Sequence, residues 1–166
     1  METHAICLVD EVPTEVVDRL LAAAYARSEE LAPGSSQYLV VVGSENGEVD
    51  KFIGMTPRMV SQQLGPEHTL FLILDARSAQ DDTALLVVRG NRYDINKDDS
   101  DDVETVRIGF AETQCTITTL EMGCGGFPEL QDIARSEDGV LRHTKPTQKG
   151  GAAPRMQLGG SSDGDQ

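Results

Sequence analysis

The chain has 166 residues, enough for one domain with a substantial core, and 39% of them are apolar with no Trp. The formal net charge of −14 at pH 7 argues against a nucleic acid or an anionic membrane surface as partner, because both are bound mainly through Lys and Arg. The same charge favours a basic protein as partner.

The sequence shows no pattern typical of a transmembrane helix or a secretory signal. No apolar run approaches the ~20 residues of a transmembrane helix, and the first residues lack the basic and apolar regions of a secretory signal. The three cysteines, Cys7, Cys115 and Cys124, are odd in number. We therefore expect reduced thiols and a cytoplasmic protein, with the nucleus as an equally reducing setting.

Three apolar runs in the first half predict buried strands. Residues 70–74, Leu-Phe-Leu-Ile-Leu, have no inside/outside alternation, which is typical of a strand buried on both faces of a sheet. Residues 5–9 and 38–42 show the same pattern. Such strands usually lie in a sheet that helices cover.

Two helices are predicted between these strands. Apolar residues recur at helical spacing after Pro13, with Thr14 as the expected N-cap. A shorter helix is predicted between Thr56 as N-cap and Gly65 as its end. The order strand, helix, strand, helix, strand predicts right-handed crossovers and a parallel three-stranded centre.

The second half predicts a different arrangement. Residues 84–88 are expected to form a fourth strand, and the alternation in 105–110 predicts a half-exposed strand antiparallel to it, nearer the sheet edge. The Thr-rich residues 115–120 are interpreted as a further short strand. A helix over 128–134 and a terminal strand at 140–141 complete the prediction.

The predicted organisation is one α/β domain over residues 1–143, with a mixed sheet in a three-layer-like arrangement. Its parallel β-α-β-α-β centre is followed by antiparallel strands and a C-terminal helix. Residues 144–166 are rich in Gly, Ser, Pro, Gln and Lys and are predicted to be disordered. A thioredoxin-like topology is the alternative, without redox chemistry because no paired cysteines follow the first strand.

Carboxylates follow two of the predicted parallel strands. Asp10 and Glu11 come after the first strand, and Asp75 comes directly after residues 70–74. Ligands of open α/β sheets bind at the carboxyl ends of the strands, so these side chains are candidate acid/base groups. The competing interpretation is that they are ordinary turn and helix-entry residues.

An acidic loop offers a weak calcium motif. Oxygen-bearing side chains follow the odd-position spacing of a calcium loop, but the turn glycine is replaced by Asp99 and the final Glu falls one position early. A solvated hairpin loop is the simpler interpretation. The candidate ligands are Asp94, Asn96, Asp98 and Ser100.

Cys124 is a weak candidate nucleophile. It lies in a Gly-rich loop before a predicted helix, where a thiol pKa can be lowered. The base would be His68 or His143, although the sequence places neither beside it. His4, His68 and His143 have no metal-ligand spacing, and neither a zinc site nor a cofactor is expected.

The order of several segments carries a resemblance to a known family. These segments are Met55-Thr56-Pro57, the 70–74 strand ending in Asp75, Leu85 to Val88, Val106-Arg107-Ile108, Thr116-Ile117, the helix at 128–134 and Asp138-Gly139-Val140-Leu141-Arg142. Together they resemble a family of small bacterial and fungal proteins known only as a domain of unknown function. The likeness covers roughly residues 5–143, and the 90–102 loop is longer here than in the family. Because the family has no assigned activity, the resemblance implies a domain extent and no chemistry.

Three functions follow as hypotheses. The first is a non-enzymatic interaction or adaptor domain that uses its acidic surface on a basic partner. The second is a small enzyme or ligand-binding protein with a site at the carboxyl ends of the parallel strands. The third is calcium binding by residues 94–104. The sequence gives no substrate and no oligomeric state.

Overall fold

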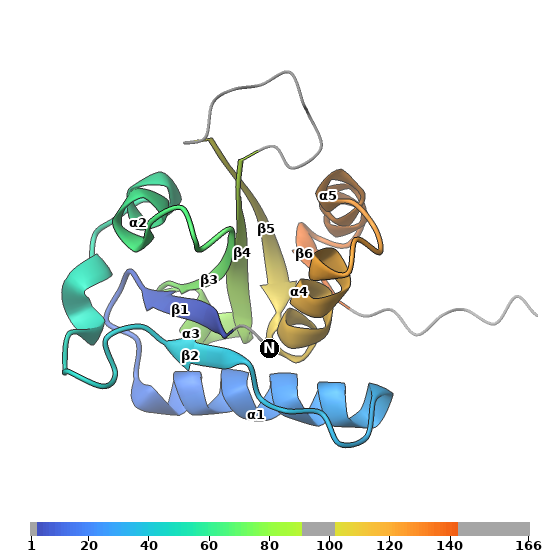
Figure 1. The fold of residues 1–166 in the computed structure, drawn as a ribbon, viewed down its shortest axis with the longest axis horizontal. Helices are drawn as coiled ribbons and strands as arrows, with labels where there is room; N and C mark the ends of the chain where they lie inside the picture. Colours follow the sequence, from blue (N-terminus) through green and yellow to red (C-terminus); the bar gives the residue numbers. More distant parts are fainter. Residues whose placement is uncertain (1–2, 91–101, 143–166) are drawn as a thin grey trace, which may run out of the picture.

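The computed structural model describes residues 3–90 and 102–142, which form one mixed α/β domain (Figure 1). A six-stranded sheet has the order β2-β1-β3-β4-β5-β6. The helices and strands are β1 (His4–Leu8), α1 (Thr14–Leu31), β2 (Leu39–Val41), the 3-10 helix η1 (Val49–Phe52), α2 (Pro57–Leu64), β3 (Leu70–Leu74), α3 (Ser78–Asp81), β4 (Thr83–Arg89), β5 (Val103–Gly109), the 3-10 helix η2 (Phe110–Glu112), α4 (Thr113–Glu121), α5 (Phe127–Ser136) and β6 (Val140–Leu141).

The pairing of the strands confirms the predicted parallel centre. β1 runs parallel to both β2 and β3, whereas β4 is antiparallel to β3 and β5 is antiparallel to β4. β6 then pairs with β5 in parallel. Among the described strands, β4 alone runs against the others, so the carboxyl ends of β1, β2, β3, β5 and β6 lie at the same edge of the sheet.

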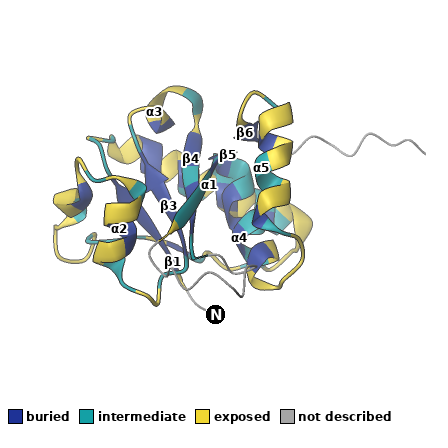
Figure 2. Cartoon of the chain, turned by 90° about the horizontal axis from the view of Figure 1, so that it is seen from above, coloured by how far each residue is buried: buried dark blue, intermediate teal, exposed yellow. Residues whose placement is uncertain are grey.

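Helices cover the sheet on both faces. The larger core lies between the sheet and α1, α4 and α5, and includes Leu20, Ile117 and Phe127. The smaller core lies under η1 and α2 and includes Phe52 and Val60. Figure 2 shows the strands as the buried middle layer, with the exposed residues on the outer faces of the helices. None of the helices in residues 3–90 and 102–142 has the length and apolar character needed to cross a membrane.

The central strands β1 and β3 are buried, as the sequence predicts, but the edge strand β2 is partly exposed. Every residue of β1 and β3 is buried. The prediction that 38–42 is buried on both faces is wrong, because β2 is an edge strand with three residues and its Val40 is 42% exposed. β6, at the other edge, has two residues.

The prediction of a strand over 115–120 is wrong, because these residues belong to α4. The hydroxyls of Thr118 and Thr119 donate to the carbonyl oxygens four residues earlier, at 3.0 and 2.8 Å, which satisfies β-branched polar side chains within a helix. Gln114 is buried and donates to the hydroxyl of Ser28 on α1 at 3.0 Å. A buried Gln conceals the apolar period of the helix from a sequence-based prediction.

The predicted N-cap is correct for α2 and off by one residue for α1. Thr56 is the N-cap of α2, and its hydroxyl accepts a hydrogen bond from the backbone N–H of Met59 at 3.4 Å, which confirms the prediction. α1 has Pro13 as its N-cap and no side-chain cap, so Thr14 is the first helical residue instead. The predicted tail, 144–166, lies outside the described residues.

Candidate functional site

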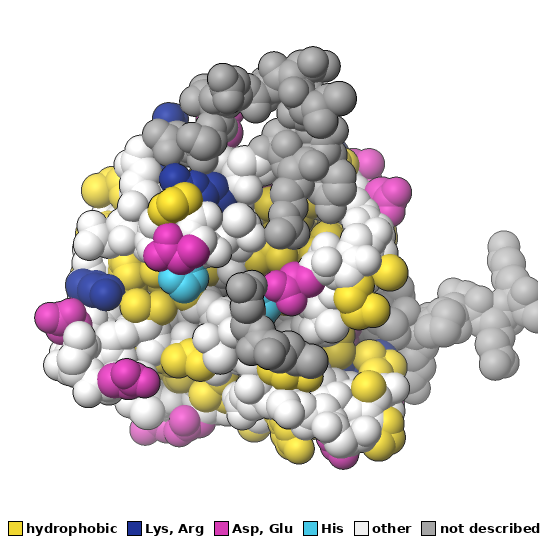
Figure 3. All heavy atoms as spheres, in the orientation of Figure 1, with side chains coloured by type: hydrophobic (Ala, Val, Ile, Leu, Met, Phe, Trp, Pro, Cys, Tyr) yellow, Lys and Arg dark blue, Asp and Glu magenta, His cyan; other side chains and the backbone are white. Residues whose placement is uncertain are grey.

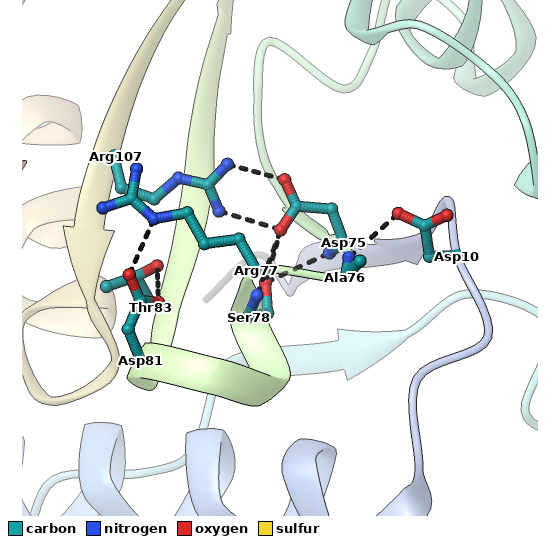
Figure 4. A network of polar contacts seen from close by, with 8 residues as sticks. All are labelled: Asp10, Asp75, Ala76, Arg77, Ser78, Asp81, Thr83 and Arg107. Carbon is teal, nitrogen blue, oxygen red and sulfur yellow. Dashed lines mark hydrogen bonds and ion pairs between the residues drawn. The ribbon is translucent and has the colours of Figure 1, made fainter.

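The carboxyl ends of β1 and β3 bring two of the predicted carboxylates together. Asp75 directly follows β3, and Asp10 lies two residues after β1. One oxygen of Asp10 accepts a hydrogen bond from the backbone N–H of Ala76 at 2.9 Å (Figure 4). This hydrogen bond links the end of β1 to the end of β3, so Asp10 has a structural role in holding the two strand ends together.

Asp75 forms a two-pronged ion pair with Arg107. Its two carboxylate oxygens accept from the two terminal guanidinium nitrogens at 2.6 and 3.0 Å (Figure 4). Arg107 lies on β5 opposite Leu85 of β4, so its side chain crosses β4 to reach the end of β3. The side chains of Arg107 and Asp75 are 13% and 23% exposed, which makes this pair largely buried.

Ser78 completes the shell around Asp75. Its backbone N–H and its hydroxyl each donate to Asp75 Oδ1 at 3.1 Å. Burial disfavours the charged carboxylate, but the hydrogen bonds and charge of Arg107, helped by Ser78, outweigh burial and hold the pKa of Asp75 below its usual value. Asp75 is therefore an ionised structural carboxylate near neutral pH.

A second acidic group continues the network along α3. Arg77 donates to Asp81 at 2.7 Å, and the Thr83 hydroxyl donates to the other oxygen of Asp81 at 2.5 Å (Figure 4). Burial acts against ionisation here too, yet these two donors keep the pKa of Asp81 below its usual value. Asp75 and Asp81 thus each pair with an arginine, Arg107 and Arg77.

This geometry does not favour acid/base catalysis by Asp10 and Asp75. A general acid or base works best with a pKa near the working pH, and the pKa of Asp75 moves the other way. Glu11 is not part of this network. Its side chain is exposed and lines a cavity near the N-terminus of α1. The sequence prediction thus placed the residues correctly, whereas their catalytic role remains a hypothesis.

Metal binding finds no support in the described part of the chain. No group of three or more His, Cys, Asp or Glu within residues 3–90 and 102–142 is placed to hold a metal ion. The candidate calcium ligands Asp94, Asn96, Asp98 and Ser100 lie outside the described residues, so that hypothesis remains a prediction.

Two of the three histidines, His4 and His68, line one cavity at the amino ends of β1 and β3. His4 is buried, and its Nε2 lies 3.2 Å from a carboxylate oxygen of Glu121. The cavity, of about 360 Å³, is lined by this pair together with His68 and Glu67. Histidine side chains accordingly appear beside acidic ones near the middle of the face in Figure 3. His143 lies outside the described residues.

Cys124 lies on the loop between α4 and α5 and is exposed. His68, one of its two possible bases, lines the cavity with His4 and does not line the groove that holds Cys124. The described residues therefore give Cys124 no histidine partner in that groove. Cys7 differs from Cys124 in being buried, and burial raises the pKa of its thiol to about 12.

The groove that contains Cys124 was not predicted from the sequence. We name it the α4–α5 groove; it has a volume of about 240 Å³ and lies where α4 and α5 meet the end of α1. It combines exposed aliphatic side chains with two glutamates. Its lining residues are Leu31, Glu112, Cys115, Thr116, Thr119, Leu120, Cys124, Gly125, Gly126, Glu129, Leu130 and Ile133.

The fold and this geometry define a mixed α/β protein in which Asp10 and Asp75 are bonded to other groups of the protein and a largely apolar groove is open to solvent. Comparisons with protein-family models, with curated proteins and with solved structures found no match. The resemblance to a family of unknown function over residues 5–143 and the thioredoxin-like alternative both remain predictions.

Proposed function

We propose that this chain is a non-enzymatic interaction domain that binds a basic, amphipathic protein segment in the α4–α5 groove. The observation that carries the proposal is the lining of the groove, where the described residues join exposed aliphatic side chains to two glutamates and include no Lys or Arg. The closed ion-pair network at the carboxyl ends of β1 and β3 supports the non-enzymatic part of the proposal.

The apolar part of the groove supplies the binding energy. Leu31 is 56% exposed and Ile133 is 44% exposed, and both line the groove beside the less exposed Leu130. Covering one such side chain contributes up to about 1.5–3 kcal/mol. A few apolar anchors on one face of a partner helix are therefore enough for a specific contact.

The charges select the partner. Glu112 and Glu129 line the same groove, and the whole chain carries a net charge of −14. Acidic side chains are spread over the face in Figure 3, whereas Lys and Arg occupy only a few separate points on it. Such a field attracts a basic segment and raises its association rate, and it disfavours an acidic one.

Arg27 identifies which glutamate to test. Arg27 lies 3.7 Å from Glu112 and 2.7 Å from Glu30, so part of the charge of Glu112 is balanced within the protein. Glu129, on the first turn of α5, is the better reporter of attraction to a partner.

A pair of synthetic peptides tests the proposal. One peptide places Leu at helical spacing with Lys between, and the other has the same Leu residues with Glu in place of Lys. Backbone amide shifts in the NMR spectrum should move at Cys115, Thr119 and Leu130 with the Lys peptide only, and its affinity should fall several-fold from ~50 to ~500 mM salt. Equal binding of both peptides, or shifts confined to other surfaces, would contradict the proposal.

A further inference from the structure

Another cavity, the one that Glu11 lines, lies at the opposite end of α1 from the α4–α5 groove, at the carboxyl ends of β1 and β2. We name it the β1–β2 pocket; its volume of about 740 Å³ falls in the range of small-molecule sites. Four chain segments meet there: the end of β1 with the following loop, the start of α1, the end of β2, and η1. The lining residues are Leu8, Glu11, Val12, Pro13, Thr14, Val17, Val41, Ser44, Val49 and Asp50.

The position of the pocket has a structural explanation. In open α/β sheets, ligands bind outside the carboxyl ends of the strands where the strand order reverses, which here is between β1 and β3. That crevice is closed by the bond from Ala76 to Asp10, and by the bond from the backbone N–H of Gly54 to the carbonyl of Val9 at 2.9 Å. The accessible space is therefore one strand further along the same edge.

A glycine shapes one wall of the pocket. Gly43 has a φ of +86°, and a Cβ there would lie 2.5 Å from the backbone carbonyl carbon of Glu48. The backbone N–H of Glu48 donates to the carbonyl of Gly43 at 2.9 Å, which closes the loop. This tight loop directs the chain into η1 and so brings Val49 and Asp50 to the pocket.

The lining points to one class of ligand. Leu8 and Val17 are buried core residues, and together with Val12, Val41 and Val49 they make the pocket largely apolar. Its charged groups are two exposed carboxylates. The N-terminus of α1 contributes only about half a positive charge, so the carboxylates dominate.

No Lys or Arg of the described residues lines this pocket. Lys51 follows Asp50 directly, but its ammonium lies over the ring of Phe52, 5.2 Å from the centroid. A ligand cation thus meets Glu11 and Asp50 without a competing lysine or arginine in the lining.

From this geometry we infer that the β1–β2 pocket binds a small amphiphilic cation, with an aliphatic or aromatic body against the valines and a protonated amine between Glu11 and Asp50. This site is separate from the α4–α5 groove and does not depend on the function proposed for that groove.

Three probes with the same six-carbon chain test the inference: hexylammonium, 1-hexanol and hexanoate. Titrated into the full chain, hexylammonium should give saturable amide shifts at Val12, Thr14 and Val41, with affinity in the order cation, alcohol, carboxylate. The α4–α5 groove amides should not move. Absence of saturation, equal binding of hexanoate, or shifts centred on the groove would overturn the inference.

Two variants and one control separate the apolar from the charged contribution. The double variant Glu11→Gln, Asp50→Asn should weaken hexylammonium by ~2–10-fold, as expected for exposed ion pairs, and leave hexanol unchanged. Ser44→Arg, at an exposed position, should abolish binding of hexylammonium. Asp18→Asn, exposed on α1 and outside the lining, is the control for loss of a surface carboxylate elsewhere and should change nothing. If the double variant and the control bind hexylammonium equally, the assigned role of the carboxylates is wrong.

Discussion

Two acidic regions of this molecule use their charges in opposite ways. At the carboxyl ends of β1 and β3, Asp10 and Asp75 accept hydrogen bonds from the backbone of Ala76 and from Arg107 and Ser78. In the α4–α5 groove, Glu129 stands beside exposed aliphatic side chains with no lysine or arginine in the lining. The sequence suggests a catalytic role for the carboxylates of the first region. In the structure, these carboxylates are already hydrogen-bonded to groups of the protein. Acidic residues at strand ends are thus weak evidence for a site until their partners are known.

The largest expected difference is in thiol reactivity, between the buried strand β1 that leads to Asp10 and the open groove. Cys7 lies in β1, within the buried sheet, and the rise of its thiol pKa from 9.0 to about 12 lowers its thiolate fraction about a thousandfold near neutral pH. Cys124, at the groove, is exposed. Iodoacetamide followed by peptide mass spectrometry should label Cys124 promptly and Cys7 only through unfolding. Labelling of both at one rate in the folded protein would contradict this distinction.

Arg107→Met should cause the next largest change. It leaves Asp75 largely buried without its guanidinium partner, which costs about 3 kcal/mol in the free energy of unfolding. Urea denaturation measures this loss. Binding of the Lys-rich peptide at the groove should be unaffected in the folded variant.

The chain offers a matched control for that substitution. Arg135 pairs with Asp132 at the same 2.6 Å, but the side chains are 72% and 73% exposed. Arg135→Met should therefore change the free energy of unfolding by less than about 0.5 kcal/mol. Equal losses in the two variants would mean that burial of the Asp75–Arg107 pair is not what makes it important.

Asp75→Asn should cost less, about 2 kcal/mol at pH 7, because it removes a charge and leaves a side chain that still accepts a hydrogen bond. The pKa of Asp75 is lowered from 3.8 in the folded chain, so its stabilisation is complete above that value and is lost as pH falls through the lowered folded pKa. Urea denaturation between pH 7 and pH 3 should show the wild type and variant converging only in the acid range. A constant difference across that range would contradict the assignment.

The smallest expected effect concerns the groove. Ile133→Lys removes an aliphatic side chain and places a positive charge in the groove, so it should weaken the Lys-rich peptide by about tenfold, with little change in the free energy of unfolding because Ile133 is 44% exposed. Ile53→Lys is the control, since Ile53 is 43% exposed and lies outside the groove. Isothermal titration of the peptide into each variant measures the difference. If both variants bind like the wild type, the groove is not the binding surface.

The fold was predictable where burial acts evenly along a strand. The apolar run 70–74 identified β3, and the alternation of strands and helices gave the parallel centre. β2 has the same apolar composition but lies at an edge, and composition alone does not separate an edge from a centre. α4 was missed because Gln114 occupies a buried helical position through its hydrogen bonds to Ser28 and to the backbone of Ser36.

The sites were less predictable, for a physical reason. Asp10 and Asp75 were placed correctly because the carboxyl ends of parallel strands meet, but Arg107 reaches Asp75 only through a register that the sequence does not reveal. The α4–α5 groove joins Leu31 to residues about a hundred positions later, such as Ile133. No local sequence pattern predicts that these residues lie side by side, because the packing of α1 against α4 brings them together.

The shortness of the two outer strands bears on how this protein behaves when it is concentrated. β2 and β6 have three and two residues, so each border of the sheet offers few free backbone donors and acceptors to a neighbouring copy. A long, fully apolar strand such as β3 would be hazardous in that place, because it would template cross-molecular pairing and fibre growth. Because its most apolar strands lie in the middle of the sheet and its edge strands are short, the chain limits aggregation from the native state.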